Sequence, residues 1–99
     1  MYLETYKEEI KALCKKNRVK YLYVFGSVLT GRFTDKSDID FIVDIDSDDP
    51  LEYADNYFNL KFALEGLLNR QIDLLENKAI KNPYLRENID SSKALLYAS

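Results

Sequence analysis

Residues 19–46 read VKYLYVFGSVLTGRFTDKSDIDFIVDID, and this stretch decides the fold. The first part, residues 19–25, is rich in β-branched and aromatic side chains and stops abruptly at Gly26, which predicts a buried strand. After a short helical turn and a loop, residues 38–46 alternate apolar and acidic side chains, and only Ile42 breaks the acidic set. This alternation predicts a second, half-buried strand with one acidic face.

Helices are predicted on both sides of these two strands. Residues 2–16 carry apolar side chains at spacings of three and four, which is the pattern of an amphipathic helix. Asp49 and Pro50 are typical of a helix N-cap and first helical position. They predict a helix over residues 51–68, which Asn69 can close in a left-handed conformation.

Residues 70–76, RQIDLLE, predict a third strand with Asp73 in its middle. After residue 77, two short helices are expected over residues 84–88 and 90–98. The order helix, strand, turn, strand, helix, strand, helices indicates one α/β (α+β) domain over residues 1–99, whose sheet has at least three strands. The directions of these strands cannot be read from the pattern.

Composition excludes several kinds of chemistry. The 99 residues contain no histidine and one cysteine, so no Ser-His-Asp or Cys-His pair, internal disulfide or multi-thiolate zinc site is available. The single thiol, Cys14, is expected to be a small buried residue of the first helix. Seventeen acidic against fourteen basic residues give a net charge of -3, the wrong sign for generic nucleic-acid binding. The absence of a long apolar stretch and of a secretion signal predicts a cytoplasmic protein without a membrane span.

Asp38 and Asp40 are the first candidates for metal binding. Two residues apart on one strand, their Cα atoms are about 6.5 to 7 Å apart and their carboxylates point the same way, so both can reach one cation. Mg²⁺ prefers carboxylate oxygen, water and substrate phosphate as ligands. Taken alone, however, a D-x-D pattern is more often part of an acidic, solvated strand edge.

Gly26 and Ser27 are candidates for phosphate binding. Glycine lets the backbone approach an anion closely, the amides at a helix start point toward phosphate, and a serine hydroxyl adds a donor. Taken alone, this pair is better explained as a plain turn from a strand into a helix. Beside the two aspartates, it predicts a nucleotide site.

Asp73 supplies the third acidic side chain. Its apolar neighbours predict a mostly buried strand, where an unpaired charge is costly. If its strand lies beside the preceding one, Asp73 joins Asp38 and Asp40, and three crowded carboxylates are stabilised chiefly by divalent cations. The alternative is a salt bridge from Asp73 to Arg70 or Lys61.

Together these motifs resemble the nucleotidyltransferase superfamily that includes polymerase β, and most closely its minimal members, the MNT proteins. The resemblance covers nearly the whole chain, including VFGSVLTGRFTDKSDIDFIVDI, NRQIDLLE and PYLRENIDSSKALLYA. It implies the nucleotidyltransferase fold, with a small mixed sheet flanked by helices. MNT proteins are commonly encoded beside a HEPN partner, an RNase toxin, and act as antitoxins; some transfer AMP from ATP to a tyrosine of that partner.

Carried over by position, the resemblance gives each candidate a role. It implies that Gly26 and Ser27 hold the nucleotide triphosphate and that Asp38 and Asp40 ligate two Mg²⁺ ions. Asp73 would complete the second metal site and help to deprotonate the attacking hydroxyl. This is the two-metal pattern, which requires no histidine.

The chain also departs from the pattern of its relatives. Many of them have arginine directly after the Gly-Ser pair, where this chain has Val28, so Arg32 and Lys36 are the basic residues expected to meet phosphate. Larger relatives hold the acceptor or the base with a second domain. Here the acceptor has to be held by a partner or by a second copy of the chain, so a hetero-oligomer and a homodimer both stay open.

Two other functions stay open at this point. A non-catalytic binding module would keep the fold and neutralise its toxin by covering it, using aromatic side chains at the interface. The candidates are Tyr53, Tyr57, Tyr84 and Tyr97, although a core position is at least as good an interpretation for Tyr57. Nucleotidyl transfer to a small molecule or to tRNA is the weaker alternative, because those enzymes share only the core motif and are generally longer.

Overall fold

A computed structural model describes residues 2–99, which form a four-stranded sheet in the order β3-β2-β1-β4. The strands are β1 (Val19–Phe25), β2 (Ile39–Ile45), β3 (Ile72–Glu76) and β4 (Ala94–Ala98). Strand β1 is antiparallel to both β2 and β4, whereas β2 is parallel to β3. The sheet is therefore mixed, and the three strands expected from the sequence lie next to one another.

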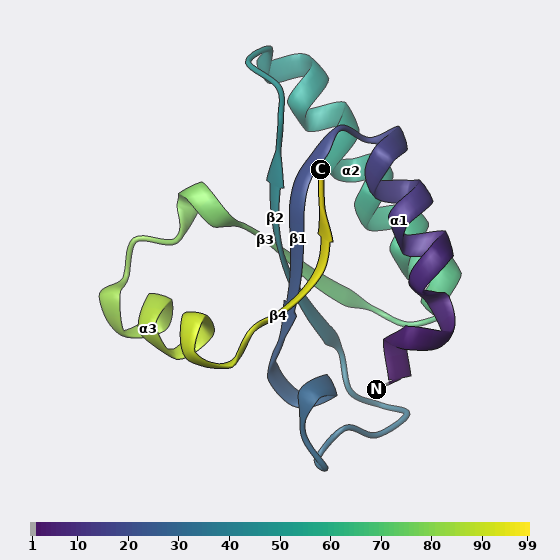
Figure 1. The fold of residues 1–99 in the computed structure, drawn as a ribbon, viewed down its shortest axis with the longest axis vertical. Helices are drawn as coiled ribbons and strands as arrows, with labels where there is room; N and C mark the ends of the chain where they lie inside the picture. The colour runs from purple at the N-terminus through teal and green to yellow at the C-terminus, as the bar shows by residue number, and fades with distance from the viewer. Residues whose placement is uncertain (1) are drawn as a thin grey trace.

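Helices cover mainly one side of this sheet. They are α1 (Lys7–Lys16), α2 (Pro50–Leu68) and α3 (Pro83–Ser92), with short 3-10 turns at Tyr2–Tyr6, Gly26–Leu29 and Asn77–Ala79. Figure 1 shows α1 and α2 together on one side of the sheet, while α3 stands off the other side. The connection from β2 through α2 to β3 is the long crossover that a parallel pair requires. Among residues 2–99, no helix combines the length and the apolar character needed to span a bilayer.

The longest helix, α2, has the ends that the sequence predicts. The Asp49 carboxylate accepts a hydrogen bond from the backbone N–H of Leu51 at 3.0 Å, which caps the first turn. Pro50 occupies a first-turn position, where its missing N–H costs nothing. Asn69 ends the helix in the left-handed conformation, with φ at 53°. Asp49, Pro50 and Asn69 thus set the two ends of α2, the helix of the crossover from β2 to β3.

The main core lies between the sheet and the pair of helices α1 and α2. Ile39 and Phe41 of β2 are fully buried there, together with Leu60 and Leu64 of α2. Cys14 of α1 is fully buried as expected, and burial raises the pKa of its thiol to about 12. This thiol is therefore a packing residue rather than a reactive group.

The prediction of two C-terminal helices was wrong. Residues 84–88 lie within a single longer helix, α3, and most of residues 90–98 form the edge strand β4. Lys93 leaves the helix in an extended conformation, with ψ at 150°, and residues 94–98 then pair with β1. A short apolar run such as ALLYA is compatible with either a helix or a strand. Here it forms a strand, because it pairs with the open edge of β1.

Replacement of Phe41 by alanine tests the core. We expect Phe41→Ala to lower the free energy of unfolding by about 3 to 5 kcal/mol, because a fully buried aromatic ring leaves a cavity. The matched control is Phe62→Ala on α2, where the side chain is 62% exposed and the change should be within about 0.5 kcal/mol. Urea unfolding of the three proteins measures both values, and equal losses in the two variants would contradict this core.

Candidate functional site

The parallel pairing of β2 with β3 places Asp40 directly opposite Asp73. Asp38 lies just before β2, two residues from Asp40. Because these residues alternate along their strands with the buried Ile39 and Ile72, their side chains lie on the sheet face away from the main core. The expected adjacency of the second and third strands is confirmed, and it brings the chain segments of all three aspartates together.

Asp40 is the carboxyl on which the neighbouring negative charges act most strongly. This residue is half-buried, whereas Asp38 and Asp73 are exposed. The pKa of the Asp40 carboxyl is raised to about 6, chiefly by burial and further by a side-chain hydrogen bond with Asp73 and by the negative charges of Asp73 and Asp38. A cation beside Asp40 would offset this burial and these negative charges.

Asp73 differs in two ways from what the sequence led us to expect. Its side chain is exposed rather than mostly buried, because β3 is an edge strand and α2 covers only its other face. The alternative salt bridge to Arg70 or Lys61 does not occur among the ion pairs of residues 2–99. Asp73 is thus open to solvent beside Asp40.

Arg70 binds the loop before β2 instead. Its Nη1 donates hydrogen bonds to the backbone oxygens of Thr34 at 3.2 Å and Ser37 at 2.9 Å. The guanidinium also lies 4.6 Å from the ring centre of Phe33 and 4.9 Å from that of Tyr2. These contacts hold the loop that leads directly into the aspartate pair. Sequence reasoning missed this role because the partners are far apart along the chain.

Gly26 lies against the carboxylate of Asp40. Its φ is +83°, and a Cβ atom built there would lie 2.6 Å from Oδ2 of Asp40. The register explains this approach, because Phe25 at the end of β1 pairs with Asp40, so the next residue turns beside that side chain. Both the backbone conformation and the available space therefore require glycine.

A pocket of about 420 Å³ lies next to this contact. Gly26, Ser27 and Arg32, three of the four predicted nucleotide-binding residues, line it together with Leu29, Thr30 and Ser92. Thr30 closes the turn by donating its N–H and its hydroxyl to the backbone oxygen of Ser27, both at 2.9 Å. Ser92, from the end of α3, also lines the pocket, and no sequence pattern indicated it.

Lys36, the fourth predicted nucleotide-binding residue, does not line this pocket. It is exposed in the loop before β2, where its backbone N–H donates to the hydroxyl of Thr34. The structure therefore brings Arg32 to the Gly-Ser turn and leaves Lys36 outside it.

The donor chemistry of the aspartates fits a hard divalent cation. Carboxylate oxygens are the preferred ligands of Mg²⁺, and the Asp40 carboxylate lies against the backbone of Gly26, which has no Cβ. As placed, however, no three acidic, histidine or cysteine side chains within residues 2–99 are gathered closely enough to hold a metal ion. Asp38 is exposed just before β2.

The tyrosines considered as interface residues differ in exposure. Tyr84 on α3 is 82% exposed, whereas Tyr53, Tyr57 and Tyr97 are partly buried. The Tyr57 hydroxyl donates to the backbone oxygen of Leu74, and its ring packs against the main core. The core interpretation of Tyr57 is therefore confirmed.

Known proteins are similar to this chain over most of its length. The family profile described as polymerase beta, nucleotidyltransferase matches residues 8–99. A Methanocaldococcus jannaschii protein that is provisionally named a protein adenylyltransferase is 34% identical over 87 residues, which cover 88% of this chain and 86% of the relative.

Solved structures show the same fold. One, provisionally described as a minimal nucleotidyltransferase, matches with a TM-score of 0.76 and 30% identity, covering 94% of this chain and 91% of the other. Another contains a tri-AMPylated Shewanella oneidensis HEPN toxin in complex with MNT antitoxin and matches with a TM-score of 0.65. Its matched chain is 20% identical, with coverage of 97% of this chain and 72% of that one, so this likeness shows the fold alone.

Replacement of Gly26 by alanine tests the contact with Asp40. We expect Gly26→Ala to lower the free energy of unfolding by about 1 to 3 kcal/mol, because the positive φ is strained for alanine and the new methyl group would meet Oδ2 of Asp40. Gly31→Ala is the matched control, since an added Cβ there meets no atom within 4 Å. Denaturant unfolding measures both, and a Gly26 variant as stable as the Gly31 variant would refute the contact.

Replacement of Asp40 by asparagine tests the charge crowding. The folded-state pKa of about 6 lies above the ordinary value of 3.8, so this carboxyl supports folding fully below pH 3.8 and loses that support as the pH rises through 6. In metal-free buffer at pH 8, Asp40→Asn should therefore be more stable than the wild type, by about 1 kcal/mol after allowance for solvent screening.

The control for this change is Asp46→Asn, an exposed aspartate just beyond β2, which should keep the pH dependence of the wild type. Thermal unfolding between pH 4 and pH 8 provides the comparison. If Asp40→Asn instead destabilises the protein at pH 8, the carboxylates do not repel one another as described.

Proposed function

Because this chain belongs to the polymerase β nucleotidyltransferase family, we propose that it transfers AMP from ATP to a tyrosine hydroxyl of a HEPN-domain RNase toxin. The transfer depends on Mg²⁺ and makes the chain the antitoxin of that toxin. One observation carries the proposal: the strand register that sets Asp73 opposite Asp40, with the backbone of Gly26 against the same carboxylate. The AMPylated HEPN toxin in the complex with an MNT antitoxin supports a HEPN protein as the acceptor.

The reaction exchanges one phosphorus–oxygen bond for another. The tyrosine oxygen bonds to the α-phosphorus of ATP, and the bond from that phosphorus to the pyrophosphate oxygen breaks. The hydroxyl proton leaves, and the products are AMP-tyrosine and pyrophosphate. The protein has to orient these atoms, neutralise the phosphate charge and accept the proton.

The three aspartates would bind the metal ions, and one of them would also accept the proton. Asp38 and Asp40 would hold two Mg²⁺ ions, with Asp73 as a further ligand of the second. When bound, these ions stabilise charge on the attacking and the leaving oxygen. Asp73 is exposed beside Asp40, so it can also accept the proton of an incoming tyrosine.

The pocket beside the Gly-Ser turn would hold the triphosphate. The amides of Gly26 and Ser27 and the Ser27 hydroxyl are donors for phosphate oxygen. Arg32 lines the same pocket and supplies positive charge where many relatives use the residue after the Gly-Ser pair. Lys36 lies outside the pocket, and its long, flexible side chain is the second basic candidate for the outer phosphates.

A second candidate function is neutralisation of the toxin by binding alone. It is favoured by an exposed apolar stripe on α2, which consists of Leu51, Phe58 and Phe62. The rings of Phe58 and Phe62 are stacked, with centroids 6.1 Å apart. An exposed aromatic stripe of this kind suits a protein interface and needs no catalysis.

Labelling of the partner tests the proposed transfer. Incubation with Mg²⁺, α-labelled ATP and the HEPN-domain product of the neighbouring gene should label that protein on tyrosine. Asp38→Asn and Asp40→Asn should each reduce the labelling at least about a hundredfold, because each removes a metal ligand. Asp44→Asn is the matched control, since Asp44 lies on the same face of β2 and is also partly buried, yet four residues away.

Protection of cells separates the two candidate functions. If the Asp38→Asn, Asp40→Asn double variant binds the toxin but no longer protects cells, catalysis is the neutralising step. If it protects as well as the wild type does, or if the wild type labels no partner, the enzymatic proposal fails and neutralisation by binding replaces it.

A further inference from the structure

Strand β4 is an edge strand, and the register of its pairing with β1 shifts between Leu95 and Tyr97. Strands β3 and β4 form the two edges. On β3, two side chains of α2 form hydrogen bonds with the strand backbone. The Glu65 carboxylate accepts a hydrogen bond from the backbone N–H of Ile72 at 3.5 Å, and the Tyr57 hydroxyl donates one to the backbone oxygen of Leu74. No side chain within residues 2–99 makes such a bond to Ala94–Ala98. The outer backbone groups of β4 are therefore available to another strand.

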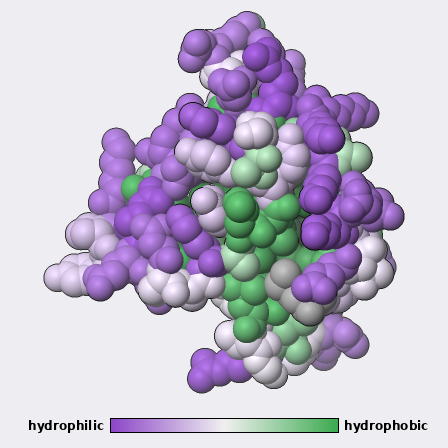
Figure 2. Space-filling model, in the orientation of Figure 1, coloured by the Kyte–Doolittle hydropathy of each residue, from purple (hydrophilic) through white to green (hydrophobic). Residues whose placement is uncertain are grey.

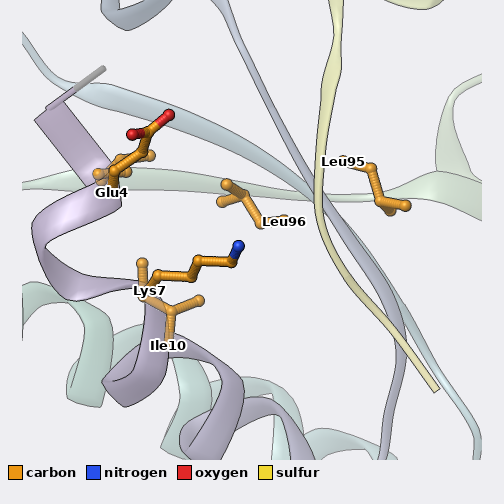
Figure 3. A pocket seen from close by; sticks show the side chains of 6 residues that line it. Glu4, Lys7, Ile10, Leu95 and Leu96 are labelled. Carbon is orange, nitrogen blue, oxygen red and sulfur yellow. The ribbon is translucent and has the colours of Figure 1, made fainter.

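An apolar pocket of about 340 Å³ adjoins this edge. Four apolar residues, Leu3, Ile10, Leu95 and Leu96, line the pocket together with Glu4 and Lys7. In Figure 3 the side chain of Leu96 points toward Ile10 and Lys7 of the helix, whereas that of Leu95 points to the opposite side of β4. Leu95 is 55% exposed. In Figure 2 a hydrophobic patch occupies the centre of the face on which β4 lies, and hydrophilic side chains flank it on the left and right.

Basic side chains line the next part of the same groove. Lys7, Lys11 and Lys15 of α1 face residues 95–98 of β4 across a space of about 430 Å³. Their spacing of four residues places them in one row along the helix. None of the three belongs to an ion pair within residues 2–99. A chain with a net charge of -3 thus concentrates unpaired positive charge beside its free strand edge.

We propose that this groove, formed by the β4 edge and the lysine row of α1, docks an extended acidic segment of a partner protein as a fifth strand. The rise of a helix places successive lysines of the row about 6 Å apart. Alternate side chains of a strand are about 6.6 to 6.8 Å apart, which nearly matches that spacing. A segment with acidic residues at alternate positions therefore meets the lysines while its backbone pairs with β4.

The apolar pocket adds a third requirement for the segment. It lies at the Lys7 end of the row, so an apolar residue on the same face of the segment, before or after the acidic ones, would fill it. The segment thus carries one apolar and two acidic side chains at alternate positions. These features belong to β4 and α1 and not to the aspartate site, so the docking proposal is independent of the proposed transfer.

Other occupants fit the groove less well. A second copy that paired its β4 with this β4 would bring two lysine rows face to face, and like charges repel. A nucleic acid would contact the lysines but leave the apolar pocket and the strand edge unused. An acidic extended segment is the occupant that uses all three features.

A peptide titration followed by NMR tests the docking site and detects affinities as weak as about millimolar. The probes are the capped heptapeptides TVTETET and TETETVT, which offer the pattern in both chain directions, and TVTKTKT, which reverses the charge. With the ¹⁵N-labelled protein, at least one acidic peptide should shift the amide resonances of Ala94–Ala98, whereas the lysine peptide should not.

Paired variants separate docking from general charge attraction. The double variant Lys11→Gln, Lys15→Gln should weaken binding about fivefold, since two exposed charge pairs are lost. The double variant Lys16→Gln, Lys81→Gln removes the same net charge from exposed positions outside the groove and should bind as the wild type does.

Several results would overturn the docking proposal. Absence of shifts in Ala94–Ala98 with both acidic peptides at millimolar concentration would do so, as would equal effects of the two double variants. Heparin shifting the same amides as strongly as the peptides would indicate a general polyanion site. Shifts of β4 that depend on protein concentration without any peptide would indicate a second copy as the occupant.

Discussion

The approach of the Gly26 backbone to the Asp40 carboxylate is the contact on which the candidate site depends, and the hydrophobic core determines its position. Phe25 pairs with Asp40 across β1 and β2, so the chain turns at Gly26 beside that side chain. A slip of β2 by one residue would move Asp38 and Asp40 into the core and Phe41 into solvent. Burial of alternate apolar residues thus also positions the charged ones.

Without a counter-charge, the neighbouring carboxylates of Asp40 and Asp73 lower the stability of the fold. The surrounding structure holds them in place despite this loss. The buried face of β2 and the caps of α2 hold β2 and β3 in parallel register, with Asp40 opposite Asp73. Arg70 holds the loop before β2 by hydrogen bonds and aromatic contacts, although it pairs with none of the aspartates. The sheet and its helices therefore hold carboxylates of like charge next to one another, as sites for cations and phosphates require.

Local signals made part of this structure predictable. Strand β1 and helix α2 lie where the sequence places them, because Gly26 ends the strand and Asp49 and Asn69 mark the helix ends. Asn82 and Pro83 carry the same N-cap signal as Asp49 and Pro50, and Asn82 indeed accepts hydrogen bonds from two backbone N–H groups of α3; this signal was available and overlooked. The strand β4, the exposure of Asp73 and the contacts of Arg70 depend on pairing between distant segments, which local patterns do not specify.

We propose that the three aspartates and the Gly-Ser turn form one metal and nucleotide site. Crystals grown with Mn²⁺ and a non-hydrolysable ATP analogue, measured at the manganese absorption edge, test this site. We expect anomalous peaks in contact with the carboxylates of Asp38, Asp40 and Asp73, and a triphosphate bound at the amides of Gly26 and Ser27. Manganese peaks away from these carboxylates, or a nucleotide bound elsewhere on the chain, would contradict it.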